Sequence, residues 1–324
     1  MNTDLTPVRI GPSEKAHAPL GLGTWSFGAN QWSGQEDANL LGAMEAALDH
    51  GITHFDSATD YGDGYSERLI GRFLAADPRR RERLFLATKA NLDELTSQRM
   101  LAAIDDSRAR LQTDMIDLYY IHWPRTGQDM RPVMEGLELA RQQGKIKAIG
   151  VSNFSVEQMM QVAEVGRIDA HQLGYNLVWR FPERDLIPYC IANDIAIVTY
   201  SSIAHGILAG RFTRQLNLPP GDQRHGILLF REDVWPFVYE GVEQFKRVAQ
   251  EAGVHLIHLA IRWLLHQPGI TTVLVGARNA SQAEFNAQAL QCEIPASVFD
   301  ELSRISDSVM QNIPDEGNPF GYHP

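Results

Sequence analysis

Side chains that can transfer protons end three short apolar segments of this chain. Asp56 closes the first segment and Tyr61 follows it by five residues, while Lys89 closes the second segment and His122 the third. Polar groups from several strand ends can converge only if those ends share one rim of a sheet or barrel. The spacing therefore predicts an active site built on a parallel β structure.

Tyr61, Lys89 and Asp56 together could form a general acid. A tyrosine hydroxyl has an ordinary pKa of about 10, and a nearby ammonium lowers that pKa by stabilising the phenolate. Lys89 can supply the ammonium, and Asp56 can hold it in place by pairing with it. His122 can donate a hydrogen bond to an oxygen beside the Tyr61 hydroxyl. Such a set would protonate a carbonyl oxygen as a hydride reaches the carbonyl carbon.

Apolar, β-branched runs alternate with helical patterns along the whole chain. The runs expected to be strands are 20–23, 52–56, 84–89, 116–122, 146–152, 170–176, 195–200 and 272–276. The clearest helical patterns are 37–50, 66–75, 96–111, 130–143, 156–165, 183–193 and 255–267. Regular alternation implies a mostly parallel sheet with helices outside it. Because the composition shows no break, we expect one α/β domain over residues 1–324, a closed (β/α)8 TIM barrel with a short N-terminal extension.

Local signals support several of the predicted helix ends. Gly51, Gly144 and Gly166 follow helical patterns, as a glycine at the C′ position does. Ser155 precedes another helical pattern, and Gln158 three residues later completes a predicted capping box.

Two connections are long for a compact domain. One runs from 206 to about 239 after the seventh predicted strand, and the other is the tail 313–324, which is rich in proline, glycine and aromatic residues. Long connections are often lids or binding loops, so we expect the tail to lie over the barrel mouth. A solvated surface loop is the alternative.

Composition narrows the class of protein. The chain has 324 residues and a net charge of -11, which argues against nucleic acid or an anionic membrane as the main partner. Cys190 and Cys292 are too few for a disulfide framework and are expected to be buried free thiols. Residues 1–20 lack the apolar stretch of a signal peptide, and no run reaches the roughly 20 residues of a membrane span. We therefore expect a cytoplasmic protein, either a monomer or a homo-oligomer.

Several segments resemble one family in their order and spacing. They are 21–25 (GLGTW), 56–62 (DSATDYG), 65–67 (YSE), 87–89 (ATK), 121–124 (IHWP), 150–154 (GVSNF), 200–210 (YSSIAHGILAG) and 276–279 (GARN). From about residue 8 to 310 the chain resembles the aldo-keto reductase superfamily. The segments 122–124 and 259–263 (LAIRW) and the ending 313–324 are most similar to bacterial members from inositol- and sugar-utilisation gene clusters.

This resemblance implies an NADPH-dependent reductase of aldehydes and ketones that works without a metal. By position, Tyr61 would be the general acid of a reversible reaction. Lys89 and Asp56 would tune the pKa of Tyr61, and His122 would orient the carbonyl. The residues implied to bind the cofactor are Gly23, Thr24, Trp25, Asp56, Ser152, Asn153, Gln172, Tyr200, Ser201, Ser202, Ile203, Ala204, His205, Gly206, Arg211, Arg224, Gly276, Ala277, Arg278, Gln282 and Asn286.

Within that set the roles differ. Ser152 and Asn153 would hold the nicotinamide carboxamide, and Tyr200 would stack on the nicotinamide ring. Arg224 would be a clamp on the diphosphate. Arg278 favours NADPH over NADH, because a guanidinium pairs with the 2′-phosphate in a bidentate manner.

Some positions depart from the family pattern. Phe285 stands where many relatives place a glutamate that contacts adenine, so the adenine is expected to meet an aromatic or apolar surface instead. His54 replaces the usual apolar residue and should project to the same side of its strand as Asp56. We expect a hydrogen-bonded histidine inside the barrel there rather than a metal ligand.

Aromatic and arginine side chains are the candidates for the substrate pocket. They are Trp25, Trp32, Trp123, Arg125, Trp179 and Arg180, with Phe320, Tyr322 and His323 from the tail. Flat aromatic faces and arginines suit a sugar-like aldehyde or ketone, although core packing is the alternative for each tryptophan.

Other functions were weighed against this one. A Rossmann oxidoreductase needs a G-x-G-x-x-G segment that opens a helix, and residues 21–26 lack the third glycine. A metal-dependent barrel hydrolase would need an H-x-H on an early strand, which is absent. The alternative left open is a cofactor-sensing regulatory subunit resembling potassium-channel β-subunits. Saturating turnover of aldehydes would favour the enzyme, and tight NADPH binding with negligible turnover would favour the sensor.

Overall fold

A closed barrel of eight parallel strands forms the centre of the computed structural model, which describes residues 6–28, 36–318 and 320–321. The strands are β1 (Leu20–Gly23), β2 (His54–Asp56), β3 (Phe85–Ala90), β4 (Ile116–Ile121), β5 (Ile146–Ser152), β6 (Ala170–Gly174), β7 (Ala196–Tyr200) and β8 (Ile270–Gly276). Each strand pairs with its sequence neighbours, and β8 closes on β1. The predicted TIM barrel is confirmed, with strand ends that differ from the predicted ones by up to two residues.

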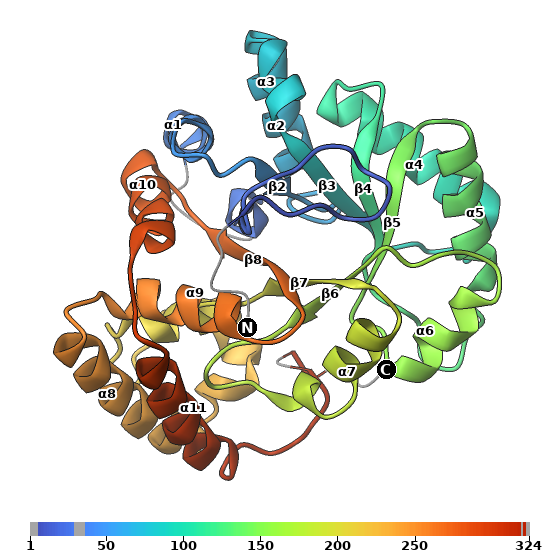
Figure 1. The fold of residues 1–324 in the computed structure, drawn as a ribbon. Helices are drawn as coiled ribbons and strands as arrows, with labels where there is room; N and C mark the ends of the chain where they lie inside the picture. Colours follow the sequence, from blue (N-terminus) through green and yellow to red (C-terminus); the bar gives the residue numbers. More distant parts are fainter. Residues whose placement is uncertain (1–5, 29–35, 319, 322–324) are drawn as a thin grey trace.

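Helices surround the barrel (Figure 1). They are α1 (Asp37–Asp49), α2 (Tyr65–Ala76), α3 (Arg79–Arg83), α4 (Ser97–Leu111), α5 (Arg131–Gln142), α6 (Val156–Ala163), α7 (Leu186–Ala192), α8 (Trp235–Glu251), α9 (Leu256–His266), α10 (Ala280–Gln288) and α11 (Ala296–Met310). The sequence patterns had not singled out α3, α8, α10 or α11. The predicted helix 183–193 began three residues before the start of α7, because Phe181–Glu183 forms a separate 3-10 turn. Among the described residues, no helix is both long and apolar enough to cross a bilayer.

The predicted helix ends are mostly confirmed. Gly51 and Gly144 adopt left-handed backbone with φ of +82° and +72°. The expectation for Gly166 was wrong, because α6 ends earlier at the C-cap Glu164. The capping box is present: the Ser155 hydroxyl accepts from the Gln158 N–H, and the Gln158 side chain accepts from the Ser155 N–H.

The end of the barrel at the strand N-termini is closed by a hairpin, drawn in dark blue in Figure 1. Val8 and His17 pair as an antiparallel bridge, and Ile10 packs among side chains of the barrel interior. The His17 ring lies 4.7 Å from the His54 ring, and burial lowers the pKa of His17 to about 4. Both histidines are therefore neutral at neutral pH.

His54 faces the barrel interior as predicted, but it is not hydrogen-bonded as expected. Neither ring nitrogen has a hydrogen-bond partner among the described residues, and the ring packs instead on His17 and Phe85. Burial lowers the pKa of His54 well below its usual value.

The second part of the long connection after β7 is packed, whereas residues 211–226 are exposed or half-buried. Leu228, Leu229 and Phe230 are buried, and the Phe230 ring stacks on Trp235 at the start of α8 with an interplanar angle of 4°. Cys190 is a buried free thiol as expected, whereas Cys292 is only half-buried.

A glycine on β5 makes room for a large side chain inside the barrel. A Cβ on Gly150 would lie 2.2 Å from Cδ1 of Tyr120, whose ring is fully buried. Real Cβ atoms do not approach an aromatic carbon this closely. A glycine at this position therefore leaves the room that the Tyr120 ring occupies.

We therefore predict that Gly150→Ala lowers the free energy of unfolding by about 1–3 kcal/mol, the usual cost of overpacking a core. Urea unfolding followed by circular dichroism measures the effect. Gly226→Ala is the matched control, because nothing lies within 4 Å of its added Cβ. The control should change stability by less than about 0.5 kcal/mol, and equal losses in the two variants would refute the packing argument.

Candidate active site

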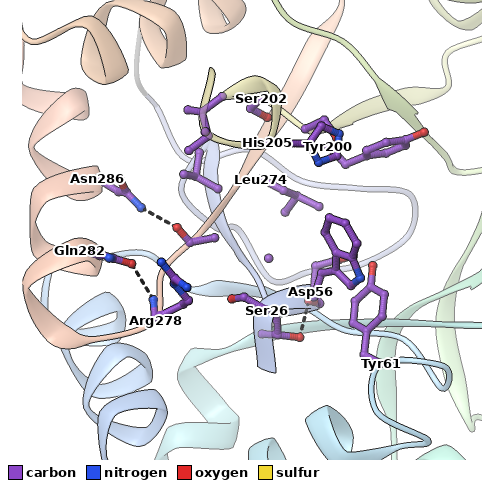
Figure 2. Close-up of a pocket in the computed structure, with 18 of the residues that line it drawn as sticks. Ser26, Asp56, Tyr61, Tyr200, Ser202, His205, Leu274, Arg278, Gln282 and Asn286 are labelled. Carbon is purple, nitrogen blue, oxygen red and sulfur yellow. Dashed lines mark hydrogen bonds between the residues drawn. The ribbon is translucent and has the colours of Figure 1, made fainter. Parts of the chain in front are cut away.

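An elongated cavity of about 800 Å³ opens at the carboxyl ends of the strands. This volume lies within the range of about 300–1,000 Å³ typical of ligand pockets. Figure 2 shows Tyr61 and Tyr200 at one end of it and Arg278, Gln282 and Asn286 at the other. The predicted convergence of strand ends is therefore present, and the cavity has two chemically different ends.

A buried ion pair lies beneath the tyrosine end. The Lys89 side chain is fully buried and its ammonium pairs with Asp56 Oδ1. It also donates to the Ser57 carbonyl over 2.8 Å, while Gln172 donates to Asp56 Oδ2 over 2.9 Å. The ammonium thus has two acceptors and the carboxylate has two donors, and a buried ion pair requires such hydrogen-bond partners.

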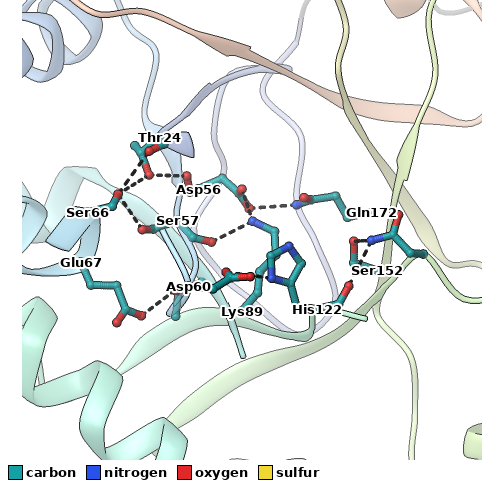
Figure 3. Close-up of polar contacts among 12 residues, drawn as sticks. Thr24, Asp56, Ser57, Asp60, Ser66, Glu67, Lys89, His122, Ser152 and Gln172 are labelled. Atoms are coloured by element: carbon teal, nitrogen blue, oxygen red, sulfur yellow. Dashed lines mark hydrogen bonds and ion pairs between the residues drawn. The ribbon is translucent and has the colours of Figure 1, made fainter. Parts of the chain in front are cut away.

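Hydroxyl groups hold the backbone around Asp56 (Figure 3). Thr24 donates to the Asp56 carbonyl over 2.8 Å, and Ser66 at the start of α2 donates to Thr24 over 2.7 Å. Ser57 in turn donates to Ser66 over 2.9 Å. This chain of contacts fixes β2 and the loop after it, which carries Tyr61.

The Tyr61 side chain lines the cavity beside both Lys89 and His122. The Lys89 Nζ lies 5.3 Å from the centre of the Tyr61 ring, and the ring centres of Tyr61 and His122 are 5.9 Å apart. The pKa of Tyr61 is raised well above its usual value, first by burial and then by the carboxylates of Asp56 and Asp60. The expected lowering by Lys89 is wrong for this structure, because Asp56 already neutralises that ammonium.

His122 lies at the end of β4 with its Nδ1 turned toward Asp60. The Nδ1 and Asp60 Oδ1 atoms are 3.1 Å apart. Burial alone would raise the pKa of the Asp60 carboxyl. Contact with His122 and the charge of Lys89 outweigh burial, so the pKa of Asp60 is lowered. The sequence analysis had not selected Asp60, although it directly precedes Tyr61.

The polar pair after β5 forms one wall at this end. Asn153 has a left-handed backbone with φ of +63°, and its side chain donates to the His122 carbonyl over 3.1 Å. The Tyr200 hydroxyl donates to Asn153 Oδ1 over 2.7 Å. Asparagine is one of the few non-glycine residues that adopt this φ readily, and its side chain here bridges the His122 carbonyl and the Tyr200 hydroxyl.

The turn after β7 can hold an anion. Ser201, Ala204, His205 and Gly206 all have positive φ, and consecutive N–H groups in such turns form concave anion sites. Arg224 lines the same stretch. The Arg224 guanidinium donates two hydrogen bonds to Asp222 and lies 5.2 Å from the centre of the Phe212 ring. Burial and the Arg224 charge lower the pKa of His205 to about 4. His205 is therefore neutral at neutral pH, and the cationic side chains along this stretch are Arg211 and the Asp222-paired Arg224.

The far end of the cavity is formed by β8 and α10. Asn286 donates to the Gly276 carbonyl over 3.2 Å, and Gln282 accepts from the Arg278 N–H over 2.9 Å. The Arg278 guanidinium forms no ion pair with any residue that the structure describes. The buried Ser26 hydroxyl, which also lines the cavity, has no hydrogen-bond partner among the described residues. A free guanidinium and an unsatisfied hydroxyl fit a polar ligand such as the 2′-phosphate nucleoside of NADPH.

Phe285 lies at this end, against histidine rings of α9. Its ring centre is 4.2 Å from that of His258 and 4.8 Å from that of His255. Phe285 and His255 both line the cavity, so this end has aromatic side chains in its wall.

An aromatic cluster encloses the tyrosine end of the cavity. The Phe320 ring of the tail lies 5.4–6.2 Å from the rings of Trp25, Trp123, Tyr200 and His205. The tail thus reaches the barrel mouth as predicted. Arg231 holds it through Glu316 at 2.8 Å.

Three candidate substrate residues do not line this cavity. Trp179 is 1% exposed and packs on Phe181. Arg180 pairs with Glu183 and Asp307, and Arg125 donates to the Leu92 carbonyl. These side chains have structural partners instead. Trp32, Tyr322 and His323 lie outside the described residues.

The residues implied to bind the cofactor all line the cavity except Ala204 and Ala277, which are buried. The sequence analysis missed several further wall residues: Ser26, Asp60, Ala209, His255, Ile257, Leu274, Val275, Asn279 and Ser281. Asp60, Ala209 and Asn279 lie inside segments that were singled out, Leu274 and Val275 belong to a predicted strand, and Ser26 directly follows the segment 21–25. His255 and Ile257 come from the start of α9, where no local pattern indicates a binding residue.

Comparison with known proteins gives a consistent result. The protein-family model described as "Aldo/keto reductase family" matches residues 19–307 of this chain. The chain is 37% identical over 277 residues to the aldo-keto reductase YhdN of Bacillus subtilis, with 82% of each chain covered. It is 26% identical over 310 residues to the NADH-specific methylglyoxal reductase of Escherichia coli, covering 89% of this chain and 94% of that one.

Two solved structures have the same fold. The glycerol dehydrogenase AKR11B4 from Gluconobacter oxydans superposes with a TM-score of 0.84 at 29% identity, over 97% of this chain and 98% of that one. An aldo/keto reductase from Klebsiella pneumoniae in complex with NADP and acetate gives a TM-score of 0.74 at 26% identity, over the same shares of the two chains.

Proposed function

Because the chain belongs to the aldo/keto reductase family, and is therefore an oxidoreductase that acts on carbonyl groups, we propose that it transfers hydride reversibly between NADPH and a small, carbohydrate-like aldehyde or ketone, with Tyr61 as the general acid. The observation that carries this proposal is the arrangement at one end of the cavity. There Tyr61 and His122 flank the same space, above a buried Lys89–Asp56 pair.

Each residue has one task in the proposed reaction. NADPH, when bound, supplies the hydride that forms the new C–H bond at the carbonyl carbon. Tyr61 gives its hydroxyl proton to the carbonyl oxygen, and solvent later returns a proton to the phenolate. Lys89, paired with Asp56, is the ammonium next to that phenolate, and His122 donates a hydrogen bond to the same oxygen. In the oxidation of an alcohol the same groups act in reverse.

The cofactor would lie along the length of the cavity. Ser152, Asn153 and Gln172 are the polar groups available to the nicotinamide at the Tyr61 end. The positive-φ turn after β7 and Arg224 suit the diphosphate. Arg278 suits the 2′-phosphate, and Phe285 offers a flat surface to the adenine.

The proposed substrate class follows from the remaining space. Trp25, Trp123 and Phe320 offer flat faces to the C–H groups of a polyol, while Asp60 and Asn153 lie among them as hydrogen-bonding groups. Relatives named for methylglyoxal and glycerol act on three-carbon compounds, which supports a small polar substrate.

We predict that Tyr61→Phe lowers kcat for carbonyl reduction by about 10²- to 10⁴-fold, the usual contribution of a general acid. NADPH binding, measured by quenching of protein fluorescence, should not change. Tyr65→Phe is the control, because Tyr65 bonds to Asp37 outside the cavity. If Tyr61→Phe kept most of the wild-type kcat, the assignment of the acid would be wrong.

We predict that Arg278→Ala raises KM for NADPH about tenfold or more, since a charge-assisted pair with a phosphate contributes roughly 1.5–3 kcal/mol. KM for NADH should change little, because NADH has no 2′-phosphate. Arg278→Lys, which keeps the charge but not the planar fork, should fall between the two. Equal increases for both cofactors would show that Arg278 does not bind the 2′-phosphate.

The substrate class can be tested with a panel of carbonyl compounds at saturating NADPH. We expect kcat/KM to be highest for hydroxylated aldehydes and ketones such as glyceraldehyde and dihydroxyacetone. Benzaldehyde and its apolar derivatives serve as the comparison. Activity confined to those aromatic aldehydes would refute the proposed class while leaving the proposed reaction intact.

A further inference from the structure

His255 lines the far end of the cavity, and the proposed reaction gives it no task. It is the N-cap residue of α9, and its Nδ1 accepts a hydrogen bond from the Ile257 backbone N–H over 3.2 Å. The centre of its ring lies 4.8 Å from that of Phe285, and the two ring planes meet at 89°. His255 and Phe285 thus form an aromatic corner in the cavity wall.

The helix cap fixes which nitrogen of His255 carries a hydrogen. A backbone N–H can only donate, so the Nδ1 that accepts from Ile257 has a lone pair, and the hydrogen of the neutral ring is on Nε2. Burial and the nearby charge of Arg211 lower the pKa of His255, which agrees with a neutral ring at neutral pH. No residue that the structure describes accepts a hydrogen bond from this Nε2–H. The cap therefore leaves His255 with one unused donor.

A second histidine of α9 holds Phe285 in this corner. His258 donates from Nε2 to the Phe285 carbonyl over 2.6 Å, since a carbonyl oxygen can only accept. The centres of the His258 and Phe285 rings are 4.2 Å apart, with an angle of 34° between the planes. The contact between α9 and α10 thus fixes both aromatic rings of the corner relative to each other.

The far end of the cavity has no carboxylate among the described residues of its wall. The acidic residues of the wall, Asp56 and Asp60, both belong to the tyrosine end. Glu284 directly precedes Phe285 but lies outside the wall, with its carboxylate 4.0 Å from Nε2 of His50, which follows α1. A flat base that binds in the corner therefore meets aromatic rings and a hydrogen-bond donor rather than a negative charge.

We propose that His255 binds the adenine of the cofactor, with its Nε2–H donating to a ring nitrogen of the base and the base packing in the corner formed with Phe285. This inference rests on the proposed function, because it takes NADPH as the cofactor. Adenine suits the corner, since its ring nitrogens N3 and N7 accept hydrogen bonds and its faces stack on aromatic rings. NADPH and NADH carry the same adenine, so His255 contributes equally to the binding of both, unlike Arg278.

The test uses His255→Asn, because asparagine is a preferred N-cap residue and the change removes only the imidazole from the wall. We expect the Kd values for NADPH, NADH and 2′,5′-ADP, measured by isothermal titration calorimetry, to rise about threefold to tenfold, the usual effect of losing one neutral hydrogen bond. The Kd for reduced nicotinamide mononucleotide, which has no adenine, should not change. Because the cap is kept, Tm should change by less than about 2 °C.

His266→Asn is the matched control. His266 is the last residue of the same helix, and its ring packs on Phe299 with the ring centres 4.5 Å apart, outside the cavity wall. The control should bind all four ligands as the wild type does. The proposal is overturned if His255→Asn leaves every Kd unchanged, if the loss is confined to ligands with a 2′-phosphate, or if the mononucleotide loses affinity equally.

Failure of this inference can be told apart from failure of the proposed function. The titrations need no turnover, so they give their answer even if no carbonyl compound is reduced. If the wild type binds neither dinucleotide, the proposed cofactor and the role of His255 both fail. If turnover is found and depends on Tyr61, but His255→Asn binds NADPH as tightly as the wild type, the reaction stands and the role of His255 fails.

Discussion

The buried Lys89–Asp56 pair is the interaction on which the architecture of this site depends. An ammonium that is fully enclosed in a protein is costly unless a counter-ion and hydrogen-bond acceptors surround it. Asp56, the Ser57 carbonyl and, through Asp56, Gln172 provide that environment. Asp56 and Lys89 come from the neighbouring strands β2 and β3, while Gln172 comes from β6, so the full set of partners meets only inside the closed barrel.

The pair also explains the unexpected electrostatics of Tyr61. Because Asp56 neutralises Lys89, little positive charge is left to stabilise a phenolate, and burial together with two carboxylates raises the pKa of Tyr61. A raised pKa keeps the hydroxyl protonated and ready to donate, but it makes the transfer harder.

The remainder of the fold supplies a rigid frame and two different binding ends. Gly150 admits the Tyr120 ring beneath the site, and the hairpin around His17 closes the opposite end of the barrel. Above the strands, Arg224 and the positive-φ turn provide positive potential along one part of the cavity, while Phe320 and its aromatic neighbours enclose the other. Charge thus separates the region suited to a phosphorylated cofactor from the region suited to a small carbonyl compound.

The sequence by itself determined the β/α alternation, the closed barrel and the residues at the strand ends, because hydrophobic periodicity and polar residues at the ends of buried runs are local properties. It also placed the polar residues of 152–153 and the tail at the barrel mouth. Only the tertiary structure decided which aromatic and arginine side chains face the cavity. Trp179 and Arg180 are as suitable in composition as Trp123, yet they pack on Phe181 and pair with Asp307. The pairing of Asp60 with His122 joins residues on different strand ends, and the balance of charge around Tyr61 depends on distances that a linear chain does not contain.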